Sequence, residues 1–300
     1  MWFKNLKIYR FTQPFTIDEE QLQQQLDGFS FRPCGSQEIA TQGWTSPLPQ
    51  GEELFLASSG YYCLSLKKQE RVLPAAVVNA QVAEKVAAIE AETGASVGKK
   101  AQQDIKQEIT HQLLPRAFTK DSFTQGFIAP KDGLLIVNAS SDGKAEVFLA
   151  HLRKAIESLP VVPLAKRSIS ADLTTWLTEQ APASIQLLEE AELRLPEEDG
   201  GIIRCKNQEL GCDEILAHLH SGKFVSKVAI EWDETLSAII QEDLAIKRVK
   251  FSDVVLEQNQ DIPKDQLAAK IDADFSLMAA ELVRFAKSLD ELLALNQDTI

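Results

Sequence analysis

The chain has 300 residues, of which 44% are hydrophobic and 25% charged, so it can bury a sizeable core. Its length suggests about two domains. This composition excludes a wholly disordered chain. Taken over the whole chain, the net charge of −13 argues against a nucleic-acid-binding protein, because a phosphate backbone selects for positive charge on the protein surface.

The first 73 residues are expected to form mainly strands. Leu6–Phe11 alternates apolar and basic side chains, as a half-buried strand does. Thr16 and Glu19 resemble a capping box that opens a short helix, which Gly28 ends. A pair of strands is predicted at 54–57 and 61–66.

Apolar side chains then recur at helical spacing in two runs between residues 76 and 114. The runs are Val78, Val82, Val86 and Ile89, then Ile105, Ile109 and Leu113. Gly94 and Gly98 separate them, which predicts two antiparallel helices whose connecting tip carries Lys99 and Lys100. Such a hairpin can protrude, because each helix offers only a narrow apolar stripe to its partner.

The segment 112–118 closes this hairpin. Pro115 lacks an amide hydrogen, so the second helix must end near Leu114. Phe118 is expected at the exit of the hairpin, outside any regular strand or helix. It either caps a small local core, as most phenylalanines would, or docks onto a partner.

Strands and helices alternate in the rest of the chain. The expected strands are 126–129 and 134–137, joined by an Asp-Gly turn, then 202–206, 226–232 and 246–251. The expected helices are 145–159, with Val147, Phe148, Leu152 and Ile156 facing inward, then 173–179 and 213–220. The extended, proline-bearing stretch 159–164 is a candidate domain boundary.

The last helix has the clearest periodicity. Its apolar residues follow a heptad seam: Ile271, Phe275, Met278, Leu282, Phe285, Leu289 and Leu292. A seam this short favours a helix laid on the second domain's sheet, and a dimer contact is the alternative. The surrounding stretch 252–300 is acidic, with ten acids against four bases.

Motifs of catalysis and cofactor binding are missing. The chain has no GxxxxGK[ST], GxGxxG, GxSxG or HExxH motif. Cys205, Cys212, His218 and His220 fit no common zinc module, so core cysteines and ordinary helix histidines are favoured. A metal-dependent nuclease would need convergent carboxylates that the spacing does not show. We therefore expect a protein that is not an enzyme and has no cofactor, reduced and cytoplasmic, without a secretion signal or a membrane span.

Basic and polar residues cluster instead around the predicted strands of the second half. Lys206 and Gln208 follow one strand, Lys223 and Lys227 flank the start of the next, and Lys247, Arg248 and Lys250 lie on a third. Each run alone is typical of a solvated face. Together they could place several cations on one side of a sheet, suited to phosphate oxygens rather than base edges.

Several ordered segments resemble the bacterial RdgC family of recombination-associated proteins, nearly end to end. They are 2–6 with Tyr9-Arg10, Pro33–Gln37, Leu113–Phe118, Ser158–Leu164, Glu198–Gly201 with Ile203-Arg204, 244–251 and Asp272–Phe275. The resemblance implies a ring-shaped homodimer that encircles duplex DNA and also binds single-stranded DNA, in both cases without sequence preference. It also implies restraint of the RecA recombinase, and a nucleoid-associated location linked to recombination and replication forks.

The resemblance also implies an architecture and its residues. The fold would be α+β: an elongated protomer with antiparallel sheets, a central domain (1–75 and 119–165), an inserted, protruding hairpin (76–118) and a C-terminal α+β unit (166–300). Phe118 would form the gate contact of the dimer and Gln208 the opposite contact. The residues expected to bind DNA are Lys99, Lys100, Lys106, Arg116, Lys206, Gln208, Lys223, Lys227, Lys247, Arg248 and Lys250. The alternative function is a protein-interaction module acting through the acidic C-terminal helical region.

Overall fold

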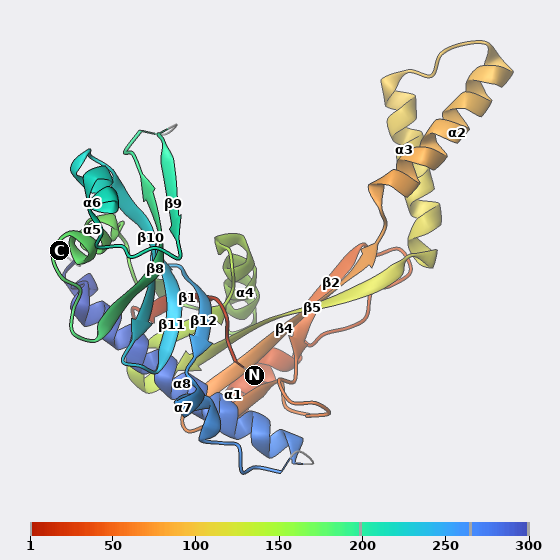
Figure 1. Ribbon diagram of the computed structural model, residues 1–300. Coiled ribbons are helices and arrows are strands. Elements are labelled where there is room, and N and C mark those ends of the chain that lie inside the picture. The colour runs from red at the N-terminus through yellow and green to blue at the C-terminus, as the bar shows by residue number, and fades with distance from the viewer. Residues whose placement is uncertain (1, 198–199, 264–265, 299–300) are drawn as a thin grey trace. The chain divides into compact units, whose positions relative to one another are not determined.

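The computed structural model describes residues 2–197, 200–263 and 266–298 (Figure 1). Glu198 and Asp199, which belong to one of the family-like segments, lie outside the described residues. Contacts divide the chain into two compact units. Unit 1 comprises Met1–Gly28, Ser46–Ser65 and Thr124–Ile300, and unit 2 comprises Phe29–Thr45 and Leu66–Phe123. The three domain ranges expected from the sequence stay a prediction.

The described residues are α+β, as predicted, with a twelve-stranded sheet of order β2-β4-β5-β6-β1-β12-β11-β10-β8-β9, while β3 pairs with β4 and β7 with β1. The strands are β1 (Leu6–Phe11), β2 (Ala40–Thr45), β3 (Phe55–Ser58), β4 (Tyr61–Val72), β5 (Phe118–Ala129), β6 (Leu134–Asn138), β7 (Val161–Pro163), β8 (Ile185–Arg194), β9 (Ile202–Lys206), β10 (Phe224–Trp232), β11 (Leu236–Gln241) and β12 (Ile246–Phe251). Pairing is antiparallel from β6 through β1 and β12 to β9.

Eight α-helices lie in the described part of the chain: α1 (Glu19–Asp27), α2 (Ala75–Thr93), α3 (Lys99–Leu113), α4 (Asp142–Ala155), α5 (Ser170–Thr178), α6 (Asp213–His220), α7 (Asp253–Glu257) and α8 (Leu267–Leu292). Among these described helices, none has both the length and the apolar character to cross a membrane.

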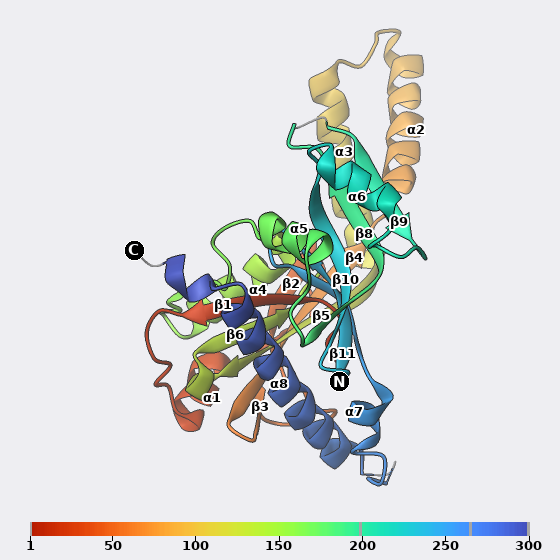
Figure 2. The same cartoon turned by 60° about the vertical axis from the view of Figure 1, so that its left-hand side comes forward.

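The core of unit 1 forms where α8 crosses the sheet (Figure 2). Phe275 and Phe285 are fully buried, and their rings meet Phe127 and Trp232 at centroid distances of 5.8 and 5.2 Å. The Trp232 indole also donates a 3.0 Å hydrogen bond to the Ser288 hydroxyl. The middle of the heptad seam, from Phe275 to Leu289, is therefore packed inside this chain, as predicted for a helix laid on a sheet, whereas Leu292 at its end is 36% exposed.

Helix α4 also packs closely on unit 1's strands, at a position where only glycine fits. A Cβ on Gly126 of β5 would lie 2.8 Å from the ring of Phe148. The helix begins at Asp142, earlier than predicted, and turns Ala145, Phe148 and Leu152 inward. The expectation that Val147 faces inward was wrong, because that side chain is 41% exposed.

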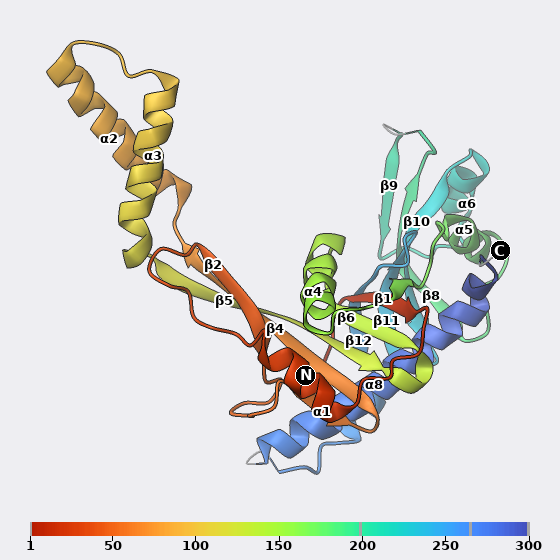
Figure 3. The ribbon, with the colours of Figure 1, turned by 180° about the vertical axis from the view of Figure 1, so that it is seen from behind.

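Unit 2 contains the predicted pair of helices, which lie side by side (Figures 1 and 3). Val78, Ile105 and Ile109 form its buried apolar cluster, and the remaining stripe residues of both helices pack against it. Helix α2 ends at Gly94, whose φ of +64° is the left-handed conformation that glycine adopts without strain. Helix α3 ends at Leu113, directly before a 3₁₀ turn that contains Pro115, as the proline predicted.

Two local predictions were wrong. Phe118 is not outside regular structure but is the first residue of β5, because six exposed, mostly polar residues extend this strand beyond its apolar half. The first helix is capped by Asp18 and not by Thr16: the Asp18 carboxylate accepts a 2.9 Å hydrogen bond from the Gln21 amide. Gly28 follows the helix end as expected.

Candidate nucleic-acid interface

The strands β8 to β12 of unit 1 have one apolar and one polar face. Val228 and Ile230 of β10 belong to the core cluster that includes α8, so Lys227, which lies between core positions, turns to the other side of the sheet. Strand register then places Lys227 and Arg204 opposite Glu192 on β8. Cations from two strands thus meet one carboxylate on the polar face.

Glu192 is the centre of this arrangement. Its side chain accepts hydrogen bonds from Arg194 Nε (2.9 Å), Arg204 Nε (3.0 Å) and Lys227 Nζ (3.1 Å), and the Ser226 hydroxyl lies 3.2 Å from Oε1. The residue is only 5% exposed. A buried carboxylate is costly unless it is paired and hydrogen-bonded, and here three cations compensate it.

The pKa of Glu192 records the balance of these effects. Burial alone would raise the pKa, but hydrogen bonds from Arg204, Arg194 and Lys227 outweigh burial and lower it to about 2. The side chain is therefore a carboxylate at every pH at which the protein would work.

A hollow of about 220 Å³ opens beside Glu192. Four cationic side chains line it together with two carboxylates, so positive charge is in excess: Arg204, Lys206, Lys227 and Arg248 against Glu190 and Glu192. Arg248 forms an ion pair with Glu190, whereas Lys206 is exposed and makes no ion pair with any described residue. In a chain of net charge −13, this excess is a candidate site for phosphate.

A bulge aims Arg248 at this hollow. The pairing of β11 with β12 shifts register between Ser237 and Ile239, and Arg248 has a φ of +53°. Buried Ile246 is followed by two residues that are not buried, and burial resumes at Val249. The extra residue directs Arg248 away from the core, where strict alternation would have placed it.

The other predicted DNA-binding residues of unit 1 lie apart from this hollow. Lys250 lines a separate hollow with Glu231 and Asp253. Lys223 lies 3.3 Å from the Ser221 hydroxyl, and Gln208 donates to Cys212 and, at 3.2 Å, to Glu214. Lys247 of β12 is the register partner of Ile239. The structure thus brings together Lys206, Lys227 and Arg248.

In unit 2, two of the predicted lysines share a groove of about 950 Å³. Lys99 and Lys106 line it with Gln102, Gln103 and Gln107, all from α3. Lys100 and Arg116 are exposed and do not line it. Amide and ammonium donors in one groove can contact phosphate oxygens without reading base edges.

Phe118 is the most exposed large apolar residue among those described, at 86%. Ile39 and Phe123 of the same unit are 66% and 52% exposed. Exposed aromatic side chains of this kind are common at protein interfaces. The option of a local core for Phe118 is therefore wrong for the isolated chain.

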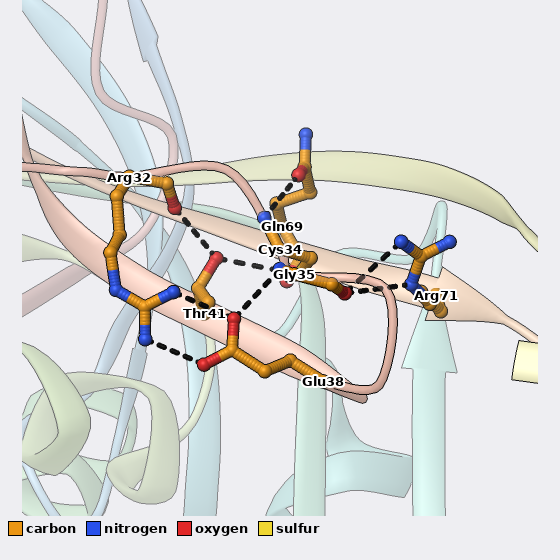
Figure 4. Close-up of polar contacts among 7 residues, drawn as sticks. All are labelled: Arg32, Cys34, Gly35, Glu38, Thr41, Gln69 and Arg71. Atoms are coloured by element: carbon orange, nitrogen blue, oxygen red, sulfur yellow. Dashed lines mark hydrogen bonds and ion pairs between the residues drawn. The ribbon is translucent and has the colours of Figure 1, made fainter. Parts of the chain in front are cut away.

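A polar network fixes the family-like loop around Cys34 to β4 (Figure 4). Arg71 donates to the Gly35 carbonyl at 3.1 Å and, with its other terminal nitrogen, to the Ala117 carbonyl at 3.1 Å. Glu38 accepts from Arg32 at 2.6 Å and from the Gly35 amide at 2.7 Å. These two bonds lower the pKa of Glu38 to about 2. Arg71 therefore links the loop to the residue before Phe118.

Replacing Arg71 by alanine is expected to loosen this loop and cost about 1 kcal/mol of stability, because the half-buried Ala117 carbonyl loses its donor, whereas water can replace the donor at the exposed Gly35 carbonyl. Amide hydrogen exchange should accelerate at residues 34–39 and 117–118. Lys68→Ala on the same strand is the control, since its ion pair with Glu70 is exposed. Unchanged exchange in the Arg71 variant would contradict the role.

The described residues form neither a metal-binding cluster nor a disulfide bond. No group of three or more His, Cys, Asp or Glu residues there could hold a metal ion. The four cysteines, all of them described, form no disulfide bond. Burial raises the pKa of Cys205, and the neighbouring Cys212 and Glu214 raise it further, which disfavours a thiolate.

The fold and this face define a class: an α+β protein with a large antiparallel sheet whose polar face gathers cations. A family model described as "Putative exonuclease, RdgC" matches residues 1–296. The chain is 62% identical to Recombination-associated protein RdgC of Pseudoalteromonas atlantica over 299 residues, 99% of either chain. Proteins of that name from Aeromonas hydrophila and Yersinia enterocolitica are 49% and 40% identical, over 96% and 98% of each chain. The chain belongs to the RdgC family, as the resemblance predicted.

Proposed function

We propose that this protein binds DNA without sequence preference, as a ring-shaped homodimer that encircles the duplex. The observation that carries the proposal is the excess of cations beside Glu192 in an otherwise acidic chain. Cations that face the phosphate backbone release counterions and give an affinity that depends on salt but not on sequence. Negative charge elsewhere would discourage binding outside the ring.

The homodimer would close through two symmetric contacts, one at Phe118 and one near Gln208. Exposure of Phe118 supports the first, because a solvent-facing phenylalanine gains most by burial against a partner. Bound to DNA in the nucleoid, such a dimer would restrain the RecA recombinase by covering its substrate. The relatives' name, recombination-associated protein, supports a role in recombination.

Fluorescence anisotropy with unrelated labelled duplexes tests this function. We expect similar affinities for all sequences and a steep, linear fall of the logarithm of the binding constant with the logarithm of salt concentration. RecA-driven strand exchange should slow when the protein is added first. A strong sequence preference, or no binding, would contradict the proposal.

We also propose that the protein is not an enzyme, although the family model's description names an exonuclease. End-labelled single-stranded and duplex DNA incubated with the protein and Mg²⁺ should stay intact. Cleavage that co-purifies with the protein and disappears with EDTA would overturn this part of the proposal.

Lys206→Gln gives a residue-level prediction. Lys206 makes no ion pair with any described residue, so its loss should change stability by no more than about 0.5 kcal/mol. If it contacts phosphate, the salt slope should fall by about 1 per bound lysine that is removed. Lys287→Gln is the matched control, because Lys287 lies on α8 and pairs with Asp132. Equal slopes for the two variants would contradict a phosphate contact at Lys206.

A further inference from the structure

The position of Glu192 is the opposite of what simple attraction of DNA requires. A carboxylate repels phosphate, yet this one is buried in the wall of the cationic hollow. It joins cations from three adjacent strands: Arg194 on β8, Arg204 on β9 and Lys227 on β10. Three strands thus converge on one anion.

Arg204 and Lys227 have hydrogen-bond donors that Glu192 does not use. Arg204 uses only its Nε on Glu192, and its two outer nitrogens bind no described residue. Lys227 gives one of its three N–H groups to Glu192. The Arg204, Arg194 and Lys227 side chains remain 66%, 37% and 32% exposed. Each is anchored on its inner side and open on its outer side.

Anchoring matters because long basic side chains lose much rotamer freedom when they bind. A cation that is already ordered pays less of that entropy on meeting a ligand, and a guanidinium fixed through Nε directs its outer nitrogens in one plane. Arg204 and Lys227 line the hollow of about 220 Å³, which has room for a phosphate group, while Arg194 holds the same carboxylate from outside the lining.

We propose that Glu192 is a positioning residue that holds Arg194, Arg204 and Lys227 ready for a backbone phosphate of nucleic acid. The inference rests on the proposed DNA-binding function and adds two arginines that were not among the predicted site residues. Glu192 acts through these cations and does not itself touch the ligand.

Glu192→Asp separates positioning from charge. The substitution keeps the net charge but withdraws the carboxylate by one methylene from its three partners. We expect duplex affinity to fall about fivefold or more, with a shallower salt slope. Glu189→Asp is the matched control: it makes the same change on the same strand, at an exposed side chain that does not line the hollow and forms no ion pair with a described residue, so affinity should stay unchanged.

A second readout needs no DNA. In the wild-type protein the Nε–H groups of Arg194 and Arg204 should exchange slowly with solvent in NMR spectra, since both donate to a buried acceptor. The Asp variant, checked for folding by circular dichroism, should lose this protection. Titration with inorganic phosphate should then shift these signals in the wild type more than in the variant.

The outcomes are distinct. Wild-type protein that fails to bind any duplex would refute the proposed function, whereas slow-exchanging arginines that respond to phosphate would still support the anion site. Glu192→Asp that binds DNA like the wild type, with unprotected arginines in both, would overturn the positioning role.

Discussion

Replacing Glu192 by glutamine is expected to lower the free energy of unfolding by about 2–3 kcal/mol. The carboxylate is 5% exposed and compensates three cations, and removing one partner of a buried ion pair costs about 3–5 kcal/mol. We take a smaller value because the cations are 32–66% exposed and water can solvate them. Urea unfolding at one fixed protein concentration measures the difference.

Glu190→Gln is the control for this stability effect. Glu190 is 31% exposed and forms one ion pair, with Arg248, so its loss should cost no more than about 1 kcal/mol. Equal losses for the two glutamine variants would mean that burial of Glu192 carries no special weight.

The same carboxylate should make stability depend on pH. Its folded pKa of about 2 lies below the ordinary value of 4.5, so the unfolded chain takes up the proton first as pH falls. The contribution of Glu192 is complete above a pH of about 4.5 and is lost as the pH falls towards 2. The stability difference between wild type and Glu192→Gln should therefore shrink between pH 6 and pH 3; a constant difference would contradict the assigned pKa.

Strong periodicity made much of the fold predictable. The heptad seam of α8 and the two apolar stripes of α2 and α3 each follow the spacing of one buried face, and these helices form as expected. Leu6–Phe11 forms the expected strand, but the prediction that it is half-buried was wrong, because Lys7 and Tyr9 are buried as well. The ends of α3 and α2 were predictable from single residues: Pro115 has no amide hydrogen to continue the helix, and Gly94 adopts the left-handed conformation after the last turn.

The strand that carries Glu192 was not predicted, and the centre of the candidate site was missed with it. Residues 185–194 contain three glutamates and adjacent leucines, a composition that suits a helix as well as a strand. The pairing of β8 with β10 also shifts register twice, which breaks strict alternation. One signal was available in the sequence: Glu192 stands between two apolar residues, Ala191 and Leu193, and both are buried in the structure.

Convergence in space is the part that sequence spacing could not supply. Lys206, Lys227 and Arg248 lie on strands that are distant in the chain, and only the order β12-β11-β10-β8-β9 brings them to one hollow. Lys250 looked equivalent in the sequence, but in its hollow two carboxylates, Glu231 and Asp253, outnumber this one lysine. A basic residue on a strand therefore predicts a polar face of the sheet. Whether its charge can bind phosphate depends on the charged side chains that surround it in the folded protein.

Phe118→Ser should leave the protomer folded and weaken the proposed dimer about 30-fold or more. An 86%-exposed side chain contributes little to its own chain, so unfolding should change by no more than about 0.5 kcal/mol. Truncating an aromatic at the centre of an interface costs about 2 kcal/mol or more, and two-fold symmetry places it in the contact twice. Sedimentation equilibrium over a range of concentrations measures the loss.

Phe123→Ser is the matched control for this prediction. Phe123 lies on the same strand five residues on, so alternation directs it to the opposite face, and the Lys67 ammonium lies 5.7 Å from its ring. If Phe118 closes a ring, its loss should also speed dissociation from circular duplex more than from short linear duplex, because a linear end lets an intact ring slide off. Equal dimer affinities for the two serine variants, or a Phe118 variant that no longer unfolds cooperatively, would assign the side chain to something other than a subunit contact.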